Sequence, residues 1–343
     1  MKKILLLVVA VGLIMSCKKT SKEQNKPEEV TIYTHRHYPP DQELFAQFEK
    51  ETGIKVNVVN ASADELIQKM QLEGPASPAD VLITVDAGRL VRAKEKGLLQ
   101  ATQSAFLDSI IPPHLRDAEK QWFALTKRAR VIAYAKDRIN PEQLSTYEDL
   151  ASDTWSKKLL IRSSSNIYNQ SLMASLIANL GEEKAKNWAQ AIVNNMARTP
   201  KGNDRDQVKA VVAGEGDLAI VNTYYVGRMI NTDDPVESNA GKGVGIFFPN
   251  QNDRGTHINI SGAGVAKYSP NKTNAIKFIE FLASGEAQSV FAEANFEYPV
   301  NQNVAPAPLL QEWGNFKEDE LNLSALGTNN KKAVLLFDEV GWQ

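Results

Sequence analysis

Strand-like and helix-like segments alternate along the first part of the chain, and this alternation limits the possible folds more than any other feature. Apolar residues recur with a period of two or as short runs in the strand-like segments, and with helical spacing in the longer segments between them. Strands that alternate with helices of this length predict a parallel sheet covered on both faces. The segments are residues 30–33, 41–53, 54–58, 63–73 and 79–85.

A second α/β series follows after Pro112 and Pro113, which interrupt the pattern. A chain of 343 residues is long enough for two domains at ~100–200 residues each, so we expect two α/β lobes. The expected strands are residues 130–135, 159–162, 217–222, 244–248 and 257–260. The expected helices are residues 170–180, 184–196, 206–213, 275–282 and 287–294.

The first residues have the pattern of an export signal. Lys2 and Lys3 precede the apolar run Ile4–Met15, which is shorter than the ~20 residues that a membrane-spanning helix needs. The run ends just before Cys17, the single cysteine of the chain, as in a bacterial lipoprotein signal. We therefore expect residues 1–16 to be removed and Cys17 to carry a lipid, although an ordinary cleaved signal is the alternative. Residues 17–29 contain no large apolar side chain and are expected to form a flexible tether.

Composition excludes several classes of protein. The 39 basic and 41 acidic residues give a net charge of -2, so no electrostatic footprint for nucleic acid is present. One cysteine cannot form an internal disulfide, and four histidines without cysteine partners cannot build a zinc finger. Two α/β lobes on an exported, lipid-anchored chain instead indicate a solute receptor that closes like a hinge.

Tyrosines follow three of the expected strands, at the carboxyl ends where open α/β sheets bind their ligands. Tyr38 follows the first strand, Tyr168 follows the strand at residues 159–162, and Tyr224 and Tyr225 follow the strand at residues 217–222. Adjacent residues of a strand point to opposite faces, so Tyr224 and Tyr225 can act together only if the backbone turns there. The run Val226–Arg228 is compatible with such a turn.

Several phenols at one point indicate a hard, highly charged cation. A phenol has a reference pKa of ~10, so only a strongly positive ion, such as trivalent iron, holds it deprotonated at neutral pH. Zinc or copper would favour imidazole and thiolate, which are scarce here. Sheet packing remains the alternative for a tyrosine pair, as does a solvated loop for residues 35–37.

Five segments resemble the bacterial ferric-ion-binding proteins of ABC iron importers, in the subgroup with a His-Tyr pair near the start. The resemblance covers nearly the whole chain after the tether, and its most specific parts are the His-Tyr and Tyr-Tyr pairs. The segments are YTHRHY (33–38), KRARVIAY (127–134), GNDRDQ (202–207), NTYYVGR (222–228) and HINISGAG (257–264).

The resemblance implies an α/β fold of the two-lobe periplasmic binding protein type (type II), with a hinge of two chain crossovers. It places residues 30–125 and 254–304 in an N-terminal lobe, and residues 126–253 and 305–343 in a C-terminal lobe. The implied iron ligands are His37, Tyr38, Tyr168, Tyr224 and Tyr225.

The implied cargo is Fe3+, received by an ABC permease with its ATPase from a periplasmic, lipid-anchored monomer. Four phenolates exceed the charge of a ferric ion, and Arg128 and Arg228 are our candidates for the nearby cations that offset the excess.

Two other functions stay open at this point. A receptor of the same fold could bind a small anion such as a phosphonate, using Ser163–Ser165, the helix start near Tyr168 and the arginines. An enzyme, such as a lyase with a tyrosine base, is the other class. Against an enzyme, the sequence has no catalytic carboxylate pair, no Ser-His-Asp or Cys-His arrangement and no phosphate loop with a Walker lysine.

Overall fold

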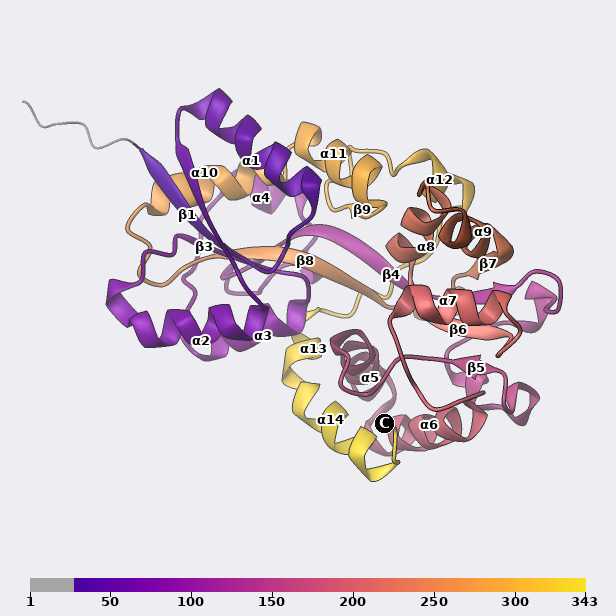
Figure 1. Ribbon diagram of the computed structural model, residues 1–343. Helices are drawn as coiled ribbons and strands as arrows, with labels where there is room; N and C mark the ends of the chain where they lie inside the picture. The colour runs from indigo at the N-terminus through magenta and orange to yellow at the C-terminus, as the bar shows by residue number, and fades with distance from the viewer. Residues whose placement is uncertain (1–27) are drawn as a thin grey trace, which may run out of the picture.

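The computed structural model describes residues 28–343, and its fold is a mixed α/β fold with two lobes (Figure 1). The predicted signal segment and Cys17 lie outside the described residues. The first strand begins at Glu29, which pairs with Lys55, so the prediction of a tether at residues 17–29 was wrong at Glu29. The strands are β1 (Glu29–Thr34), β2 (Lys55–Asn60), β3 (Val81–Thr84), β4 (Phe123–Ala135), β5 (Leu159–Leu160), β6 (Leu218–Asn222), β7 (Val244–Phe247), β8 (Ile258–Val265) and β9 (Tyr298–Pro299).

The strands form one sheet in the order β2-β1-β3-β8-β4-β6-β5, with β7 and β9 also paired to β4. Parallel pairing, as predicted, joins β1 to β2, β1 to β3, and β5 to β6. Strands β4 and β8 run antiparallel to each other and to the strands beside them. The parallel sheet predicted from residues 30–85 is thus confirmed in β1, β2 and β3, and the antiparallel strands come from the later part of the chain.

Strand β4 links the two lobes. Its first half pairs with β8 of the N-terminal lobe as far as Ala129, and its second half pairs with β6 of the C-terminal lobe from Arg130 onward. The sequence predicted a strand only from Arg130, because Lys127 and Arg128 interrupt the apolar pattern. In the structure Arg128 and Arg130 are both 2% exposed, since other parts of the chain supply polar partners for them.

Fourteen α-helices pack around the sheet in the described part of the chain. Polar caps define several of their starts: the side chain of Ser62 accepts a hydrogen bond from the amide of Glu65, and that of Asn166 accepts one from Tyr168. The helices are α1 (Pro39–Thr52), α2 (Ala63–Glu73), α3 (Ala87–Glu95), α4 (Ala105–Ile110), α5 (Ile167–Leu180), α6 (Glu182–Asn195), α7 (Asp204–Val212), α8 (Thr223–Ile230), α9 (Pro235–Gly243), α10 (Lys272–Leu282), α11 (Gly285–Asn295), α12 (Pro308–Glu312), α13 (Ser324–Thr328) and α14 (Asn330–Glu339).

Figure 1 shows helices α1, α2, α3, α10 and α11 around the N-terminal lobe, and α5 to α9 around the C-terminal lobe, with β4 and β8 running between them. The long helices expected from apolar spacing are present, with bounds that differ by a few residues. Helices α3, α4, α8, α9 and those from α12 onward were not predicted. Several of these are short, so that spacing alone does not reveal them. Among residues 28–343, no helix is both long and apolar enough to cross a membrane.

Helix α13 packs against both lobes, since it contacts α3 in one and α5 in the other. Gly327 permits this close approach: a Cβ atom built on it would lie 2.4 Å from Cβ of Val91 in α3. Such a distance is far below van der Waals contact, so any side chain at residue 327 must push the two helices apart.

We therefore expect Gly327→Ala to lower the free energy of unfolding by about 1–3 kcal/mol, the usual cost of overpacking. Urea denaturation monitored by circular dichroism measures this change. Gly285→Ala is the matched control, because a Cβ atom there would lie no closer than 3.8 Å to Val304. Equal stabilities of the two variants would contradict the tight contact at α13.

Candidate metal centre

Four tyrosines of the candidate site lie at the starts of helices rather than at the ends of strands. Tyr38 directly precedes α1, Tyr168 is in the first turn of α5, and Tyr224 and Tyr225 are in the first turn of α8. The strand does end before the Tyr-Tyr pair, as the sequence requires, but the backbone enters α8 there instead of turning at Val226–Arg228. A helix start carries partial positive charge, so its electrostatic field favours negative charge nearby.

At the end of strand β6, a backbone amide donates to a buried carboxylate instead of to another strand. The amide of Asn222 donates to Asp204 Oδ2 at 2.8 Å, and the same oxygen accepts a hydrogen bond from Arg130 Nη1 at 2.8 Å. Asn222 then serves as the residue before helix α8. These contacts set the point at which the chain changes from strand to helix, and so set where Tyr224 and Tyr225 lie.

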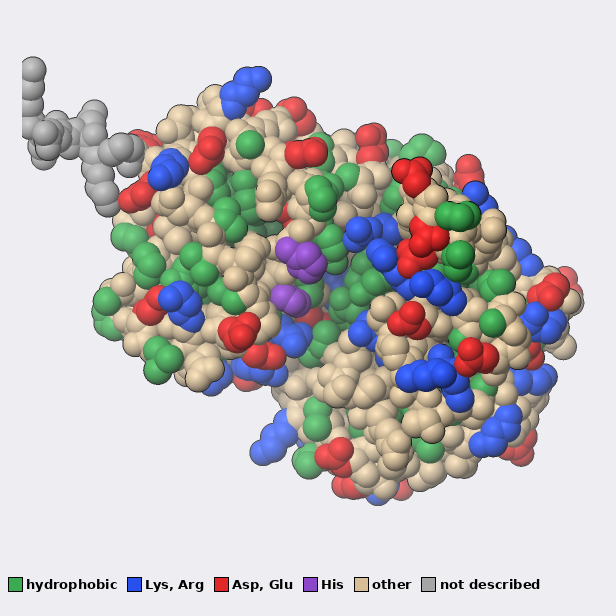
Figure 2. Space-filling model, in the orientation of Figure 1, with side chains coloured by type: hydrophobic (Ala, Val, Ile, Leu, Met, Phe, Trp, Pro, Cys, Tyr) green, Lys and Arg blue, Asp and Glu red, His purple; other side chains and the backbone are tan. Residues whose placement is uncertain are grey.

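A cavity of about 380 Å³ lies between the two lobes at these helix starts. Both lobes contribute to its lining: the loop before α1 comes from one, and residues of α5, α7 and α8 come from the other. Figure 2 shows histidine side chains at this hollow, facing Lys and Arg side chains across it. The lining residues are His35, His37, Tyr38, Pro39, Val85, Tyr168, Arg205, Tyr225 and Arg228.

Tyr224 lies directly behind this lining and is 5% exposed. Its hydroxyl is 3.1 Å from the hydroxyl of Tyr168, and its ring centre is 4.3 Å from that of Tyr225. On the other side of the cavity the rings of His37 and Tyr38 stack at 5.2 Å. The structure thus brings all five predicted ligand residues to one place, drawn from both lobes.

Burial determines the protonation state of these phenols in the ion-free protein. Loss of solvation raises the pKa of Tyr38, Tyr168 and Tyr224, and repulsion between neighbouring phenolates raises it further at Tyr168 and Tyr224. These three phenols are therefore neutral at physiological pH. A ligand that binds their deprotonated forms must displace protons.

Arginine side chains surround the phenols. The guanidinium of Arg128 lies 5.2 Å from the ring centre of Tyr168, and that of Arg228 lies 5.1 Å from the ring centre of Tyr38. Both predicted candidates thus lie beside a phenol. Two further arginines were not predicted: Arg162 is 5.5 Å from the ring centre of Tyr168, and Arg205 lines the cavity. Arg205 does belong to the GNDRDQ segment of the resemblance, which was the available signal.

His35 is a further cavity residue, although the sequence suggested a solvated loop. It is half-buried, and its Nδ1 atom has no hydrogen-bond partner in the structure. Burial, with a smaller contribution from Arg89, lowers the pKa of His35, so this imidazole is neutral at physiological pH. His37 is exposed, and its Nδ1 is 3.3 Å from the carbonyl oxygen of His35.

The donor chemistry of the cavity is dominated by phenols. Within residues 28–343, no group of three or more His, Cys, Asp or Glu side chains is arranged to hold a metal ion. Phenolate oxygen is a hard donor, and hard donors suit small, highly charged cations better than zinc or copper. Arginines close to the phenols reduce the cost of gathering several negative charges in a buried cleft.

A two-lobed α/β fold with a polar cavity between the lobes defines a class of binding protein, and the sequence agrees. Residues 34–289 match the family of bacterial extracellular solute-binding proteins, and the chain belongs to this family. It is 47% identical to Iron uptake protein A1 of Synechocystis over 341 residues, which cover 98% of this chain and 95% of that protein.

Solved structures give the same result. The chain is 52% identical to the IdiA (FutA) protein of Trichodesmium in complex with iron and citrate, covering 92% of this chain and 100% of that one, with a TM-score of 0.90. The chain is 45% identical to the ferric binding protein from Campylobacter jejuni, covering 92% of this chain and 100% of that one, with a TM-score of 0.86. The predicted resemblance to bacterial ferric-ion-binding proteins and the predicted periplasmic binding protein fold are confirmed.

Proposed function

We propose that this chain captures ferric ion in the cavity between its lobes and delivers it to an ABC permease. One observation carries the proposal: four phenols and an imidazole from two lobes meet at one cavity that has arginines beside it. Relatives with high identity are named as iron uptake and ferric binding proteins, which supports the same cargo.

The proposed ligands divide unequally between the lobes. His37 and Tyr38 come from the N-terminal lobe, whereas Tyr168, Tyr224 and Tyr225 come from the C-terminal lobe. An ion bound to all five therefore requires the lobes to approach each other, and its binding energy favours the closed form. The permease and its ATPase would then recognise the closed, loaded protein.

Arg128 and Arg228 are the proposed counter-charges. Four phenolates carry one more negative charge than a ferric ion neutralises, which is unfavourable in a buried site without a nearby cation. Arg128 is 2% exposed and donates to the carbonyl of Val85, so its guanidinium is held beside Tyr168. Arg228 projects from α8, the same helix that carries Tyr224 and Tyr225.

The lobe boundaries are part of the proposal. We assign residues 30–125 and 254–304 to the N-terminal lobe, and residues 126–253 and 305–343 to the C-terminal lobe. The exchange of β4 from β8 to β6 between Ala129 and Arg130 supports a crossover near the first boundary. We further propose a periplasmic monomer with a lipid anchor on Cys17 and no enzymatic activity.

A small-anion receptor is the second candidate function, because Arg205 and Arg228 line the cavity and could bind a phosphonate. The rest of the polar lining favours the ferric proposal, because it consists of phenols and imidazoles, which can act as metal ligands.

We expect the purified chain to develop a visible phenolate-to-iron charge-transfer band when it is loaded with ferric citrate. Tyr224→Phe and Tyr225→Phe should each weaken ferric affinity at least ~10-fold, about 1.4 kcal/mol, because each removes one phenolate oxygen. Competition with citrate, followed at the band, measures these affinities. Tyr268→Phe is the control, since this tyrosine is 48% exposed and does not line the cavity. A protein that remains colourless and iron-free after loading would contradict the proposal.

Ferric affinity should also fall as the solution is acidified. Burial raises the pKa of Tyr38, Tyr168 and Tyr224, so the binding of ferric ion must release their protons. For each proton released, the ferric affinity falls about tenfold when the pH falls by one unit. Chelator competition between pH 5 and pH 8, corrected for the chelator's own protonation, measures the slope. An anion site built on arginines would keep its affinity over this range, because their charge does not change. A flat profile would thus favour the second candidate.

Cys17→Ser tests the anchor. We expect this variant to move from the membrane fraction to the soluble extracytoplasmic fraction while its ferric affinity stays within about twofold of the wild type, because the cavity lies in residues 35–228. Fractionation followed by immunoblotting measures the distribution. Retention of the variant in the membrane would mean that the apolar run Ile4–Met15 anchors the chain uncleaved.

A further inference from the structure

Arg36 occupies a buried position immediately before the His-Tyr pair. Its side chain is 2% exposed, and it contacts two carboxylates. Nη2 lies 2.9 Å from Asp41 Oδ1 and 3.0 Å from Glu297 Oε2, and Nε donates to Asp41 Oδ1 at 3.0 Å. Nη1 donates to Glu297 Oε1 at 3.3 Å, which makes the contact with Glu297 two-pronged.

These contacts connect the loop to strands that join the lobes. Arg36 Nη1 donates to Ser261 Oγ in β8 at 2.7 Å. Glu297 Oε1 accepts a hydrogen bond from Thr126 Oγ1 in β4 at 2.8 Å. Thr126 lies at the irregularity where the register of β4 against β8 shifts. Ser261, Thr126 and Glu297 are all buried, so water does not compete for these bonds.

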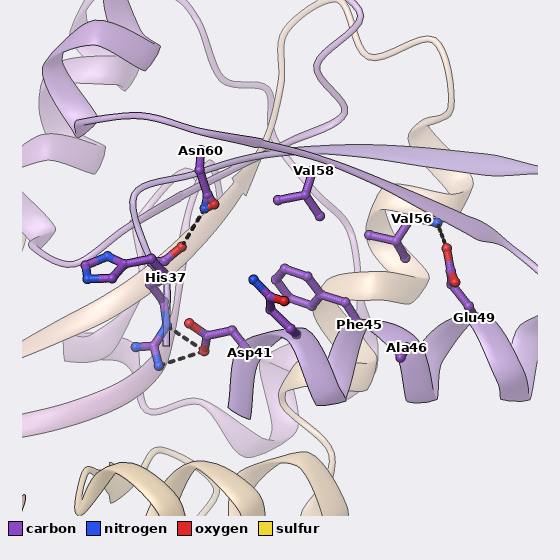
Figure 3. A pocket seen from close by; sticks show the side chains of 10 residues that line it. His37, Asp41, Phe45, Ala46, Glu49, Val56, Val58 and Asn60 are labelled. Atoms are coloured by element: carbon purple, nitrogen blue, oxygen red, sulfur yellow. Dashed lines mark hydrogen bonds and ion pairs between the residues drawn. The ribbon is translucent and has the colours of Figure 1, made fainter. Parts of the chain in front are cut away.

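The backbone of the same loop is held independently. Asn60 at the end of β2 donates to the carbonyl oxygen of Arg36 at 3.1 Å, and the amide of Arg36 donates to Thr34 Oγ1 at 3.0 Å. Asp41 accepts from the Tyr38 amide through Oδ2 at 3.3 Å, besides its contacts with Arg36. Figure 3 shows Asp41 and Asn60 at this loop, with dashed lines for the contacts that each makes with Arg36, next to a groove lined by Phe45 and Val58.

The guanidinium of Arg36 also lies 5.2 Å from the ring centre of Tyr38. Arg36 therefore restrains this residue twice, at its amide through Asp41 and at its ring directly. Burying an arginine with two carboxylates costs desolvation energy, and apolar residues of similar volume often stabilise a fold equally well. A role beyond stability therefore accounts better for this cluster.

We propose that Arg36, clamped by Asp41 and Glu297, is a positioning residue that holds Tyr38 at the cavity. The inference rests on the proposed function and deepens it, because it names the residue that fixes the position of Tyr38, the phenol of the N-terminal lobe. His37, the other proposed ligand of this lobe, is exposed, and its ring stacks on that of Tyr38 at 5.2 Å, so the position of Tyr38 also bears on His37. Closure of the N-terminal lobe on the ion thus depends on where Arg36 keeps Tyr38.

A double-mutant cycle on the full chain tests this role, with Arg36→Met, Tyr38→Phe and their combination. Citrate competition measures ferric affinity, and the charge-transfer maximum reports the ligand set. We expect Arg36→Met to weaken affinity at least ~10-fold and to shift the band, but to change affinity less than about threefold when Tyr38 is already Phe. A side chain that acts only through Tyr38 has nothing left to position in that background.

Arg138→Met is the control. Arg138 also contacts two carboxylates, Asp137 at 3.0 Å and Asp217 at 2.9 Å, but all three residues belong to the C-terminal lobe and none lines the cavity. We expect this variant to keep wild-type affinity and an unshifted band. Circular dichroism and urea denaturation establish that each variant is folded. If Arg36→Met does not fold, Glu297→Gln enters the same cycle, and we expect a smaller loss that again disappears with Tyr38→Phe.

Equal losses of affinity in the wild-type and Tyr38→Phe backgrounds would overturn the positioning role, and so would unchanged affinity and colour in a folded Arg36→Met variant. Both results leave the ferric proposal standing, because the wild type remains coloured. A colourless wild type would instead remove the ferric function and the positioning role together.

Discussion

The pairing of β4 with strands of both lobes is the constraint on which the rest of the structure depends. One strand of 13 residues pairs with β8 at its start and with β6 at its end, so it carries the chain between the lobes and holds them side by side. The cavity exists because this arrangement brings the loop before α1 opposite the starts of α5 and α8. Arg128 and Arg130 lie at the crossing itself, next to the ring of Tyr168.

Two opposing electrostatic effects act on the phenols of the cavity, and their combination suits a highly charged cation. Burial raises the pKa of three phenols and keeps them neutral without an ion, whereas arginines and helix starts favour negative charge at the same place. Neither effect alone would make a selective site. Together they describe a cavity that becomes anionic only when a strongly positive ligand displaces the phenol protons.

Polar groups buried beneath the cavity connect its two sides to the crossing strands. Arg36 links the Tyr38 loop to Ser261 and, through Glu297, to Thr126. On the other side Arg130 bonds Asp204, whose carboxylate also accepts from the backbone where β6 gives way to α8. In both cases a buried arginine and a carboxylate determine where a segment bearing a tyrosine begins.

The alternation of strands and helices and the position of each tyrosine near the end of an element could be predicted from the sequence, because each depends on residues close together in the chain. The tertiary structure decided the rest. Strand β4 extends through Lys127 and Arg128 because distant groups satisfy these charges, and Tyr224 and Tyr225 are helical because Asp204 binds the end of β6. Arg36 looked like part of a solvated loop, yet its partner Glu297 lies 261 residues away. Local pattern cannot reveal an ion pair between residues that only folding brings together.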